Sequence, residues 1–466
     1  MATLENHQSI VRINIPGSKS LSHRYLIAAA LASGESELEH VQDSSDISVT
    51  KRLLEGLGVK ISGQDPTCLK VRGLAGKVTG GLGRPMDCDV GESGTTCRLL
   101  SAVLAAGHGL FNIYGHGRMH QRPVAELCDA LTKLGAGICY KGNAGCPPFL
   151  LQAQGLDPEL LEGELSLGME TSSQYFSGLL LAAPLATKPL VLHLGGTKAI
   201  SWPYVSLTLQ CLKDFQIPFT VAARTDPKAP WVPLEDCAWR EVTLVKPGCL
   251  RISVQPAPYV AGHFHIESDW SSASYFLAAG VLGDRPVCVE GLHEDSLQGD
   301  RIILDILAKM GAEIHTEPHG ITSYPSKLHG VELEMGSSPD LVQTVAILAA
   351  FAKGSTRIRN VAHLRFKESD RLQAPAEELG KIGVVVDTLS DGLLISGRGD
   401  HVKHKPINLV PGSLSAHNDH RMAMSLALLE LRHPEIHVAE LLDNPNCLHK
   451  SFPSFWQLWS KVVPAL

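Results

Sequence analysis

Short polar segments that lead into runs of Ala and Leu recur along this sequence and constrain its fold more than any other feature. In the first copy, a Pro-Gly pair at 16–17 ends a strand, and Ser-Lys-Ser at 18–20 suits the first turn of a helix. The helix body that follows, residues 26–32, has almost no polar face, so it should be buried on every side. Its polar N-terminus, where backbone N–H groups lack partners, favours an anion.

Five further stretches repeat this pattern, which is typical of a repeat architecture. They lie at residues 92–107, 171–186, 269–283, 337–354 and 418–431, roughly 70–100 residues apart. A second signature is an amphipathic helix that ends at a Gly; it occurs at Leu57-Gly58, Leu134-Gly135, Met310-Gly311 and Ile382-Gly383, with a degraded copy at Phe215-Gln216. One polar helix start is ordinary capping. Six such starts, several with basic residues nearby, favour a site where helix ends converge on anions.

Length and charge limit the class of protein. At 466 residues the chain is too long for one hydrophobic core and should form two domains. Its net charge of −7 argues against nucleic acid or a membrane surface as a partner, so any anion site must be a local concentration of Lys and Arg. The apolar runs are too short to span a bilayer, and the N-terminus resembles neither a signal peptide nor a transit peptide. We therefore expect a cytoplasmic protein.

Cys and His residues give no sign of a metal site. The 11 Cys include no C-x-x-C pair, which indicates reduced thiols rather than a disulfide framework or a structural metal. Two His pairs, His263/His265 and His417/His420, are worth testing as ligands, but neither has a carboxylate or thiol partner at suitable spacing. We expect no metal and, in the absence of a cofactor motif, no organic cofactor.

The domain boundary is expected near residues 255–268, which are rich in Pro and polar turn residues. It divides the chain into an N-terminal domain over residues 16–266 and a C-terminal domain over residues 267–466. A short strand within residues 1–15 precedes the first helix, and the last helix, over residues 452–463, has no strand after it. We therefore expect the N-terminal strand to complete the last repeat, and with it the C-terminal domain.

Basic residues near the helix starts are candidates for anion binding. The most specific stretch is residues 365–372, which are expected to form a helix with Lys367 and Arg371 on one face and Glu368 beside them. Arg122 precedes a Pro that opens an amphipathic helix, so it can present its guanidinium to a phosphate or a carboxylate.

Together, these motifs resemble one family closely. They are Ile15-Pro-Gly-Ser-Lys-Ser-Leu-Ser-His-Arg24, Gly94-Thr95, Arg98, Arg122-Pro123, Ser172-Ser-Gln-Tyr175, Asp269 to Phe276, Lys367-Glu-Ser-Asp-Arg371, Asn418-Asp-His-Arg421 and Lys450. Over nearly its whole length the chain resembles the 5-enolpyruvylshikimate-3-phosphate (EPSP) synthase family, the enolpyruvyl transferases of the shikimate pathway of aromatic amino-acid biosynthesis. The resemblance implies a two-domain inside-out α/β barrel joined by a double crossover, each domain having three βαβαββ repeats around buried helices.

The resemblance also implies a monomeric enzyme that joins two small-molecule substrates, shikimate 3-phosphate and phosphoenolpyruvate, without a cofactor. The 5-hydroxyl attacks C2 of the enol while C3 is protonated, and the tetrahedral adduct then eliminates phosphate. Such a site must hold two anions side by side, deprotonate a hydroxyl and protonate a carbon. By resemblance, Asp340 is the base, assisted by Lys367, and Glu368 is the acid. The residues agree with these roles, because Asp340 opens a buried helix, where a carboxylate can be desolvated.

The full set of site residues is carried over from the family by position. The catalytic residues are Asp340, Glu368, Lys19 and Lys367. Shikimate 3-phosphate is expected to contact Lys19, Ser20, Arg24, Ser172, Ser173, Gln174, Ser201, Tyr204, Asp340, His363 and Lys367. Phosphoenolpyruvate is expected to contact Lys19, Gly94, Arg122, Gln174, Arg371, Arg421 and Lys450.

Three positions depart from the pattern of many family members, which have Asn there. Glu92 would repel phosphoenolpyruvate unless it were paired, so we expect it to contact a Lys or Arg, or to cap its helix, rather than to face the substrate. The other two departures are His23 and His363, and a titrating His363 would add pH dependence to a phosphate contact.

Other functions stay open at this point. The sister enzyme that uses UDP-N-acetylglucosamine shares the fold, but it typically has a reactive Cys where this chain has Gly117. A paralog that acts on a different acceptor is a second alternative, motivated by the three departures. An inactive anion-binding homologue is the third, and retention of Asp340, Glu368 and the expected cations argues against it.

Overall fold

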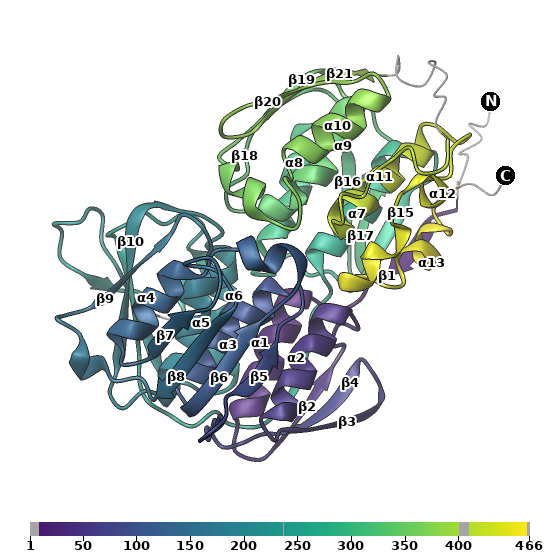
Figure 1. Ribbon diagram of the computed structural model, residues 1–466. Coiled ribbons are helices and arrows are strands. Elements are labelled where there is room, and N and C mark those ends of the chain that lie inside the picture. The colour runs from purple at the N-terminus through teal and green to yellow at the C-terminus, as the bar shows by residue number, and fades with distance from the viewer. Residues whose placement is uncertain (1–8, 236, 400–409, 464–466) are drawn as a thin grey trace, which may run out of the picture. The chain divides into compact units, whose positions relative to one another are not determined.

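The computed structural model describes residues 9–235, 237–399 and 410–463, which form a mixed α/β structure (Figure 1). The chain divides into two compact units. The N-terminal unit comprises Gly17–Ile266 with Leu297–Gly299, and the C-terminal unit comprises Met1–Pro16, Glu267–Ser296 and Asp300–Leu466.

In the N-terminal unit, helices alternate with short strands. The helices are α1 (Lys19–Leu31), α2 (Ser45–Gly56), α3 (Gly94–Ala105), α4 (Ala125–Lys133), α5 (Gln174–Ala182) and α6 (Pro203–Asp214), with 3₁₀ turns η1 (Gly117–Gln121), η2 (Pro158–Leu160), η3 (Ala183–Leu185) and η4 (Ala238–Glu241). The strands are β2 (Glu35–Glu39), β3 (Lys60–Asp65), β4 (Cys68–Arg72), β5 (Met86–Asp89), β6 (His108–Tyr114), β7 (Gly137–Tyr140), β8 (Phe149–Gln154), β9 (Leu165–Met169), β10 (Leu190–Ala199), β11 (Phe219–Ala223), β12 (Val232–Pro233), β13 (Leu250–Val254) and β14 (His263–His265).

The C-terminal unit is built in the same way. Its helices are α7 (Trp270–Leu282), α8 (Ile303–Lys309), α9 (Val342–Phe351), α10 (Gln373–Lys381), α11 (His420–Ala427), α12 (Val438–Leu441) and α13 (Phe455–Trp459), with 3₁₀ turns η5 (Gly299–Ile302), η6 (Pro339–Leu341), η7 (Ala362–Phe366), η9 (Leu428–Leu431) and η10 (Pro445–Lys450). Its strands are β1 (Val11–Asn14), β15 (Val287–Glu290), β16 (Glu313–Glu317), β17 (Gly320–Tyr324), β18 (Glu332–Glu334), β19 (Lys353–Arg359), β20 (Val385–Thr388) and β21 (Leu393–Arg398).

Among the described residues, four sheets share one strand order, and the fifth, β9-β10-β13-β11-β12, has β12 as an additional edge strand. In β5-β6-β8-β7, the first pair is parallel and the other two pairs are antiparallel. Because a parallel pair needs a crossover, α3 connects β5 to β6, and the segment from β5 to β8 forms one βαβαββ unit. The same order recurs in β18-β19-β21-β20. Around α11, the described residues show only an isolated parallel bridge, between Leu414 and Leu442.

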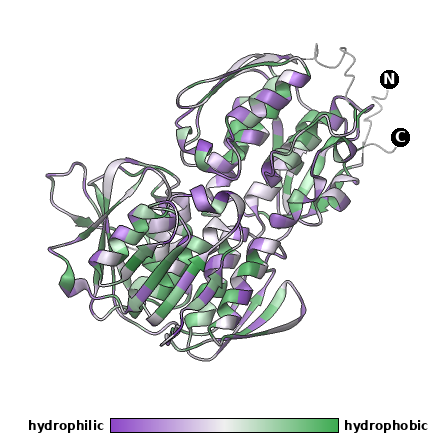
Figure 2. Cartoon of the chain, in the orientation of Figure 1, coloured by the Kyte–Doolittle hydropathy of each residue, from purple (hydrophilic) through white to green (hydrophobic). Residues whose placement is uncertain are grey.

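Helices with almost no polar face form the cores of both units, as their sequences predict. In α9 every residue is buried, and in α7 every residue except Ser271 is buried. Residues 26–31 of α1 are at most 3% exposed. Each fully buried Leu or Ile contributes roughly 1.5–3 kcal/mol to folding, so these apolar helices (green in Figure 2) stabilise each unit from its centre. Polar side chains are left for the helix N-termini.

Two strands belong to a different unit from the helix that follows them in the sequence. β1 precedes α1, yet it pairs in parallel with β15 in the C-terminal unit. β14 precedes α7, yet it pairs in parallel with β2 in the N-terminal unit. The N-terminal strand belongs to the C-terminal unit, as expected, but its placement in the last repeat is wrong, because its partner β15 follows α7, the first helix of that unit. Residues 1–8 of that predicted strand lie outside the described residues.

The helix predicted over residues 365–372 is also wrong. The 3₁₀ turn η7 ends at Phe366, Lys367 is extended (φ −89°, ψ −157°), and α10 begins only at Gln373. The cause is Asp370, whose carboxylate accepts hydrogen bonds from the backbone N–H groups of Leu372 and Gln373 and so favours a helix start here. Lys367 and Arg371 are therefore not neighbours on a helix face.

The Gly-ended helices are confirmed. Gly58, Gly135, Gly311 and Gly383 each follow a helix with φ between 78° and 103°, and the degraded copy places Gln216 at φ 60°. Within residues 9–235, 237–399 and 410–463, no helix has the length and apolar character of a membrane span.

Candidate active site

Polar side chains gather at the N-termini of the buried helices in each unit. Lys19 begins α1 and forms an ion pair with Asp46 in the first turn of α2. The two side chains are 17% and 7% exposed, so the pair is largely removed from water. Ser18, the N-cap of α1, makes no side-chain capping bond. An anion at this helix start would therefore compete with Asp46 for Lys19.

Arg24 joins three helices of the N-terminal unit. Its guanidinium is buried and donates to Thr208 Oγ1 (2.8 Å), Ser177 Oγ (3.1 Å) and the carbonyl oxygens of Ser20 (2.8 Å) and Tyr204 (2.9 Å). Burial lowers the pKa of Arg24 to about 10. Since its donors contact neutral oxygens on α1, α5 and α6, Arg24 fixes the relative positions of these helix starts.

His23 lies one residue earlier and is neutral. Its Nδ1 is 2.9 Å from Thr50 Oγ1, and the side chain is buried. Burial first, and then the charges of Lys19 and Arg24, lower its pKa well below the usual value. His23 therefore adds no positive charge at the start of α1.

Gly94 and Arg122 fit together closely. Gly94 opens α3, and a Cβ atom at this position would lie 2.5 Å from Cζ of Arg122. The Arg122 guanidinium therefore lies directly against the backbone of Gly94, where a side chain would displace it. Arg122 also donates from Nη1 to the carbonyl oxygen of Glu92 (3.3 Å). Ser93, rather than Glu92, caps α3 by accepting from the backbone N–H of Thr96.

Gln174 at the start of α5 is held from both sides. Its Oε1 accepts from Arg98 Nη1 (2.8 Å), and its Nε2 donates to Thr95 Oγ1 (2.9 Å). Ser172 Oγ accepts from the backbone N–H of Gln174 (3.2 Å), and Ser173 is the N-cap residue. In the sequence, Arg98 is a motif residue without an assigned role. Its contact with Gln174 shows that it orients this side-chain amide.

Ser201 and Tyr204 lie at the start of α6. Ser201 is buried and has φ 57°, a left-handed conformation that is uncommon for a residue other than Gly. Tyr204 lies in the first turn of α6, and its carbonyl oxygen accepts from Arg24. Backbone strain of this kind is concentrated at functional positions.

In the C-terminal unit, Arg371 is the centre of a buried ionic network. Its Nε donates to Asp419 Oδ2 (2.7 Å), Nη1 to Asp340 Oδ1 (2.9 Å) and Nη2 to Glu368 Oε2 (2.9 Å). Burial by itself would lower the pKa of Arg371, but Asp419, Glu368 and Asp340 together raise it above its ordinary value. Ser369 Oγ also donates to Asp419 (2.9 Å).

Asp340 is held by a second guanidinium. Arg421 Nη2 donates to Asp340 Oδ2 (2.9 Å), so each oxygen of this carboxylate accepts from a different Arg. Arg421 is positioned by Asp419, which caps α11 by accepting from the Arg421 backbone N–H (3.0 Å). Asp419 therefore contacts the guanidinium of Arg371 and caps the helix that carries Arg421.

Three further predicted residues have known places but untested roles. His363 lies in η7, Lys367 follows this turn directly, and Lys450 ends η10. Their contacts with substrate stay predictions, as do those of the other residues carried over from the family.

Sequence reasoning did not find Asp46, Asp419 or Asp300 as members of these clusters. Asp419 opens a predicted helix, and that local pattern is the signal that could have drawn attention to it. Asp46 and Asp300 carry no such signal, because their partners Lys19 and Ser271 are distant in sequence.

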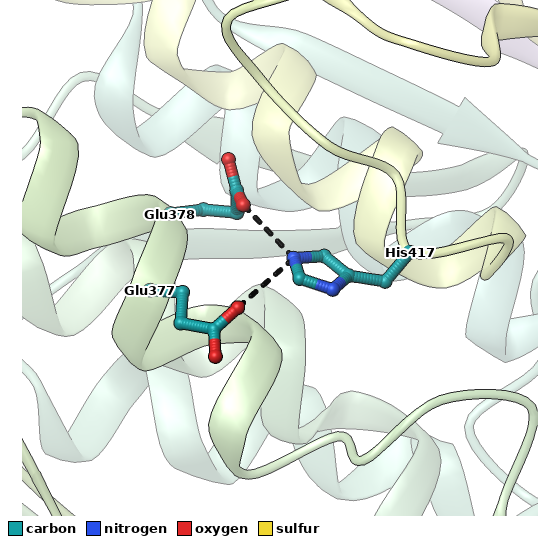
Figure 3. Close-up of side chains that lie close together, drawn as sticks. All are labelled: Glu377, Glu378 and His417. Atoms are coloured by element: carbon teal, nitrogen blue, oxygen red, sulfur yellow. Dashed lines mark hydrogen bonds and ion pairs between the residues drawn. The ribbon is translucent and has the colours of Figure 1, made fainter.

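A separate group of side chains joins α10 to the segment before α11 (Figure 3). His417 Nε2 is 2.8 Å from Glu378 Oε1 and 3.8 Å from Glu377 Oε2, and the three donor atoms lie within 4.8 Å of one another. Lys381 Nζ already contacts both oxygens of Glu378 (2.8 and 2.7 Å). These side chains therefore form an ion-pair network, in which Lys381 and His417 balance the carboxylate of Glu378.

Both His pairs have carboxylate partners that their sequence spacing did not indicate. Glu378 reaches His417 from 39 residues away, which no local spacing reveals. His263 and His265 both lie beside Glu39, at 3.1 and 3.5 Å, on the neighbouring strand β2.

The fold and these clusters define a mixed α/β protein of two units, in which guanidinium and ammonium groups line the starts of buried helices. The family model for EPSP synthase (3-phosphoshikimate 1-carboxyvinyltransferase) matches residues 6–229 and 245–459. The 3-phosphoshikimate 1-carboxyvinyltransferases of Marinomonas sp. (strain MWYL1) and Shewanella denitrificans are each 36% identical to this chain, over 97% of its length and 96% of theirs.

A solved structure agrees with these relatives in fold. EPSP synthase from Acinetobacter baumannii has a TM-score of 0.70 and 24% identity, with 98% of this chain and 96% of that chain covered. The chain belongs to the EPSP synthase family.

Proposed function

We propose that this protein transfers the enolpyruvyl group of phosphoenolpyruvate to the 5-hydroxyl of shikimate 3-phosphate and releases phosphate. The observation that carries the proposal is the family match across nearly the whole chain. The clusters add support, because a reaction between two anions needs cations at fixed positions, and each unit presents them at helix starts. The alternative of a paralog with another acceptor is favoured only by the three departures from the family pattern, and retention of Asp340, Glu368 and the expected cations argues against an inactive homologue.

The reaction has two steps. The 5-hydroxyl oxygen forms a bond to C2 of phosphoenolpyruvate, its proton goes to a base, and C3 takes up a proton. The C2–O bond to phosphate then breaks, and loss of a proton from C3 restores the double bond. Asp340 is the proposed base and Lys367 assists it. Arg371 and Arg421, which donate to Asp340 in this structure, can turn to the anionic groups of phosphoenolpyruvate and leave the carboxylate free to accept the proton.

Glu368 is the proposed acid for C3, and its ion pair sets a condition on that role. Glu368 contacts Arg371 at 2.9 Å, and a nearby cation favours the ionised form of a carboxyl group. We therefore expect Glu368 to become protonated only after Arg371 has moved to phosphoenolpyruvate. Substrate binding would then switch on the acid.

The remaining site residues keep their proposed partners. For shikimate 3-phosphate, Lys19, Ser20 and the starts of α5 and α6 are the proposed contacts. Arg24 contributes largely by holding these starts, because four of its hydrogen bonds are already made. For phosphoenolpyruvate, Gly94 allows close approach, and Arg122 and Lys450 supply charge. The finer fold, an inside-out barrel of three βαβαββ repeats in each of the domains 16–266 and 267–466, is proposed by family resemblance, as are a monomer and a cytoplasmic location.

The test is phosphate release by the purified protein with both substrates. We expect turnover that requires shikimate 3-phosphate and phosphoenolpyruvate together and that falls at least a thousandfold in Asp340→Asn, as loss of a general base predicts. Asp387→Asn, an exposed carboxylate on β20, is the matched control and should retain full activity. Tight binding of shikimate 3-phosphate without turnover would instead identify an inactive homologue. Absence of both would indicate a different acceptor.

A further inference from the structure

Asp300 is a buried carboxylate of the C-terminal unit that the proposed mechanism does not use. It lies in η5, and its side chain is almost completely enclosed, with the residue 4% exposed. Its Oδ2 accepts a short hydrogen bond from Ser271 Oγ in the first turn of α7. Its Oδ1 is buried and has no hydrogen-bond partner among the described residues. A buried carboxylate with one free oxygen is costly unless it has a role or holds a proton.

Ser271 connects Asp300 to the proposed base. Ser271 Oγ lies 3.4 Å from Arg421 Nη2, and the same nitrogen donates to Asp340 Oδ2 at 2.9 Å. Asp300, Ser271, Arg421 and Asp340 therefore form a continuous chain of polar contacts. Ser271 and Asp340 share one guanidinium nitrogen, and Asp300 is linked to it through the Ser271 hydroxyl.

Asp300 differs from the other carboxylates of this network in its contacts. Its carboxylates are Asp300, Asp340, Glu368 and Asp419, and its guanidiniums are Arg371 and Arg421. Asp340, Glu368 and Asp419 each contact an Arg directly, whereas among the described residues Asp300 has no ion pair. Burial first, and then the charge of Asp340, raise the pKa of Asp300 to about 7, and Asp269 adds to this rise. Arg421 and the hydrogen bond from Ser271 oppose it. Asp300 is the member of the network that takes up a proton near neutral pH.

We propose that Asp300 is a positioning residue for the reaction, which acts through Ser271 to set how firmly Arg421 is held for phosphoenolpyruvate. This inference rests on the proposed function. When Asp300 is ionised, the Ser271 hydroxyl donates to it and presents its lone pairs to Arg421, which draws this guanidinium away from an incoming anion. When Asp300 is protonated, the added negative charge disappears and Arg421 is available. Tyr275, whose pKa burial raises to about 12, stays neutral beside Arg421 and does not alter this balance.

The test compares Asp300→Asn with the wild type in the phosphate-release assay. The wild-type KM for phosphoenolpyruvate should rise between pH 6 and pH 8, roughly fivefold for one partly screened charge at short range. Asp300→Asn should match the wild type at pH 6 and lack this rise, with KM for shikimate 3-phosphate unchanged. Asp305→Asn, an exposed carboxylate on α8, is the control and should follow the wild-type profile. A purely structural role would lower kcat equally at every pH, and that result would overturn the proposal.

A second variant and a second measurement keep the test decisive. Ser271→Ala removes the hydroxyl through which Asp300 acts on Arg421, so its KM for phosphoenolpyruvate should rise clearly less between pH 6 and pH 8 than that of the wild type. Thermal unfolding requires no turnover: because the folded pKa of Asp300 is raised, its contribution to stability falls as pH increases from about 4 to 7, and the stability difference between the wild type and Asp300→Asn should change accordingly. No phosphate release by the wild type would refute the proposed function. Turnover with superimposable profiles for the wild type and Asp300→Asn, or identical unfolding curves, would refute this inference alone.

Discussion

At the scale of single residues, the C-terminal cluster depends on Asp419. This carboxylate is completely buried, accepts two hydrogen bonds from Arg371 and caps the helix that carries Arg421. Its charge is compensated only because it lies against a guanidinium. The same contact anchors Arg371 through Nε and Nη2, so Asp419 contributes to both stability and geometry.

Asp419→Asn should therefore destabilise the protein. Removal of one partner of a buried ion pair costs about 3 kcal/mol, here moderated by Asp340 and Glu368, which still contact Arg371. The midpoint of urea unfolding measures the effect. The exposed variant Asp387→Asn is the control and should change stability by less than about 0.5 kcal/mol. Equal midpoints for both variants would show that Arg371 does not depend on this carboxylate.

Glu92 provides a second test at this scale. Its side chain is exposed and its Oε1 lies close to Gly117, where a Cβ atom would be 2.7 Å away, and Arg122 donates to its backbone oxygen. We expect Glu92→Gln to leave phosphoenolpyruvate affinity within about twofold, since an exposed charge is strongly screened. Equilibrium binding of phosphoenolpyruvate in the presence of shikimate 3-phosphate measures this. A greatly tightened complex would mean that the carboxylate faces the substrate.

At the scale of elements, α10 holds the segment that leads into α11. Two consecutive residues other than Gly, His417 and Asn418, have positive φ (52° and 54°), a strained arrangement that the surroundings must enforce. Glu378 on α10 accepts from the backbone N–H of Ser415 (3.0 Å) and contacts His417 (2.8 Å). Asp419 follows directly, so this link helps to place the cap on which both guanidiniums depend.

The link should make stability depend on pH. The hydrogen bond to Glu378 raises the pKa of His417, and although burial would raise the pKa of Glu378, its bonds to His417, Lys381 and Ser415 lower it. The His417 contribution is complete below about pH 6.5 and is lost as pH rises through the folded pKa; that of Glu378 is complete above about pH 4.5 and is lost at lower pH. The ion pair therefore contributes most between these values.

His417→Gln should cost about 1 kcal/mol at pH 6 and clearly less at pH 9. Urea unfolding at both pH values measures the difference. His319→Gln, in an exposed turn, is the control and should show no such pH dependence. A cost that is the same at both pH values would mean that His417 acts only as a neutral hydrogen-bonding group.

The elements also show which features the sequence could predict. Ser93, Asp269 and Asp419 accept from backbone N–H groups at the starts of α3, α7 and α11, as the polar starts predicted, because capping is local. The helix over residues 365–372 was wrong because the carboxylate of Asp370 starts α10 later. The contact of Arg371 with Asp419 spans 48 residues, and no local pattern reports it.

At the scale of the whole molecule, the chain exchanges two strands between its units. β1 lies in the C-terminal unit although the helix that follows it lies in the N-terminal unit, and β14 shows the reverse. The register of β1 with β15 joins residues 276 positions apart, Val11 with Val287 and Ile13 with Val289. Each unit therefore lacks an edge strand until a distant part of the chain supplies it, and this pairing was beyond prediction from alternation of polar and apolar residues.

This exchange predicts that a mutation in β1 weakens the C-terminal unit, although the helix that follows β1 in the sequence belongs to the N-terminal unit. Ile13 is completely buried in the core of the C-terminal unit, and Ile13→Ala should cost about 3 kcal/mol. Amide hydrogen exchange should then accelerate in β15 and β17, whereas β2 and β4 keep their protection. Ile10→Ala, at a partly exposed position just before β1, is the control and should change neither pattern.

The reciprocal variant lies in β14. Phe264 stacks on Phe215 with ring centroids 4.2 Å apart and contacts Tyr25 edge-on at 5.6 Å, both in the N-terminal unit. Because it is only partly buried, Phe264→Ala should cost about 2 kcal/mol. Its exchange pattern should be the opposite, faster in β2 and β4 and unchanged in β15 and β17. If either variant accelerated exchange equally in both units, the units would unfold as one cooperative body, and each strand would stabilise the whole chain rather than the unit it joins.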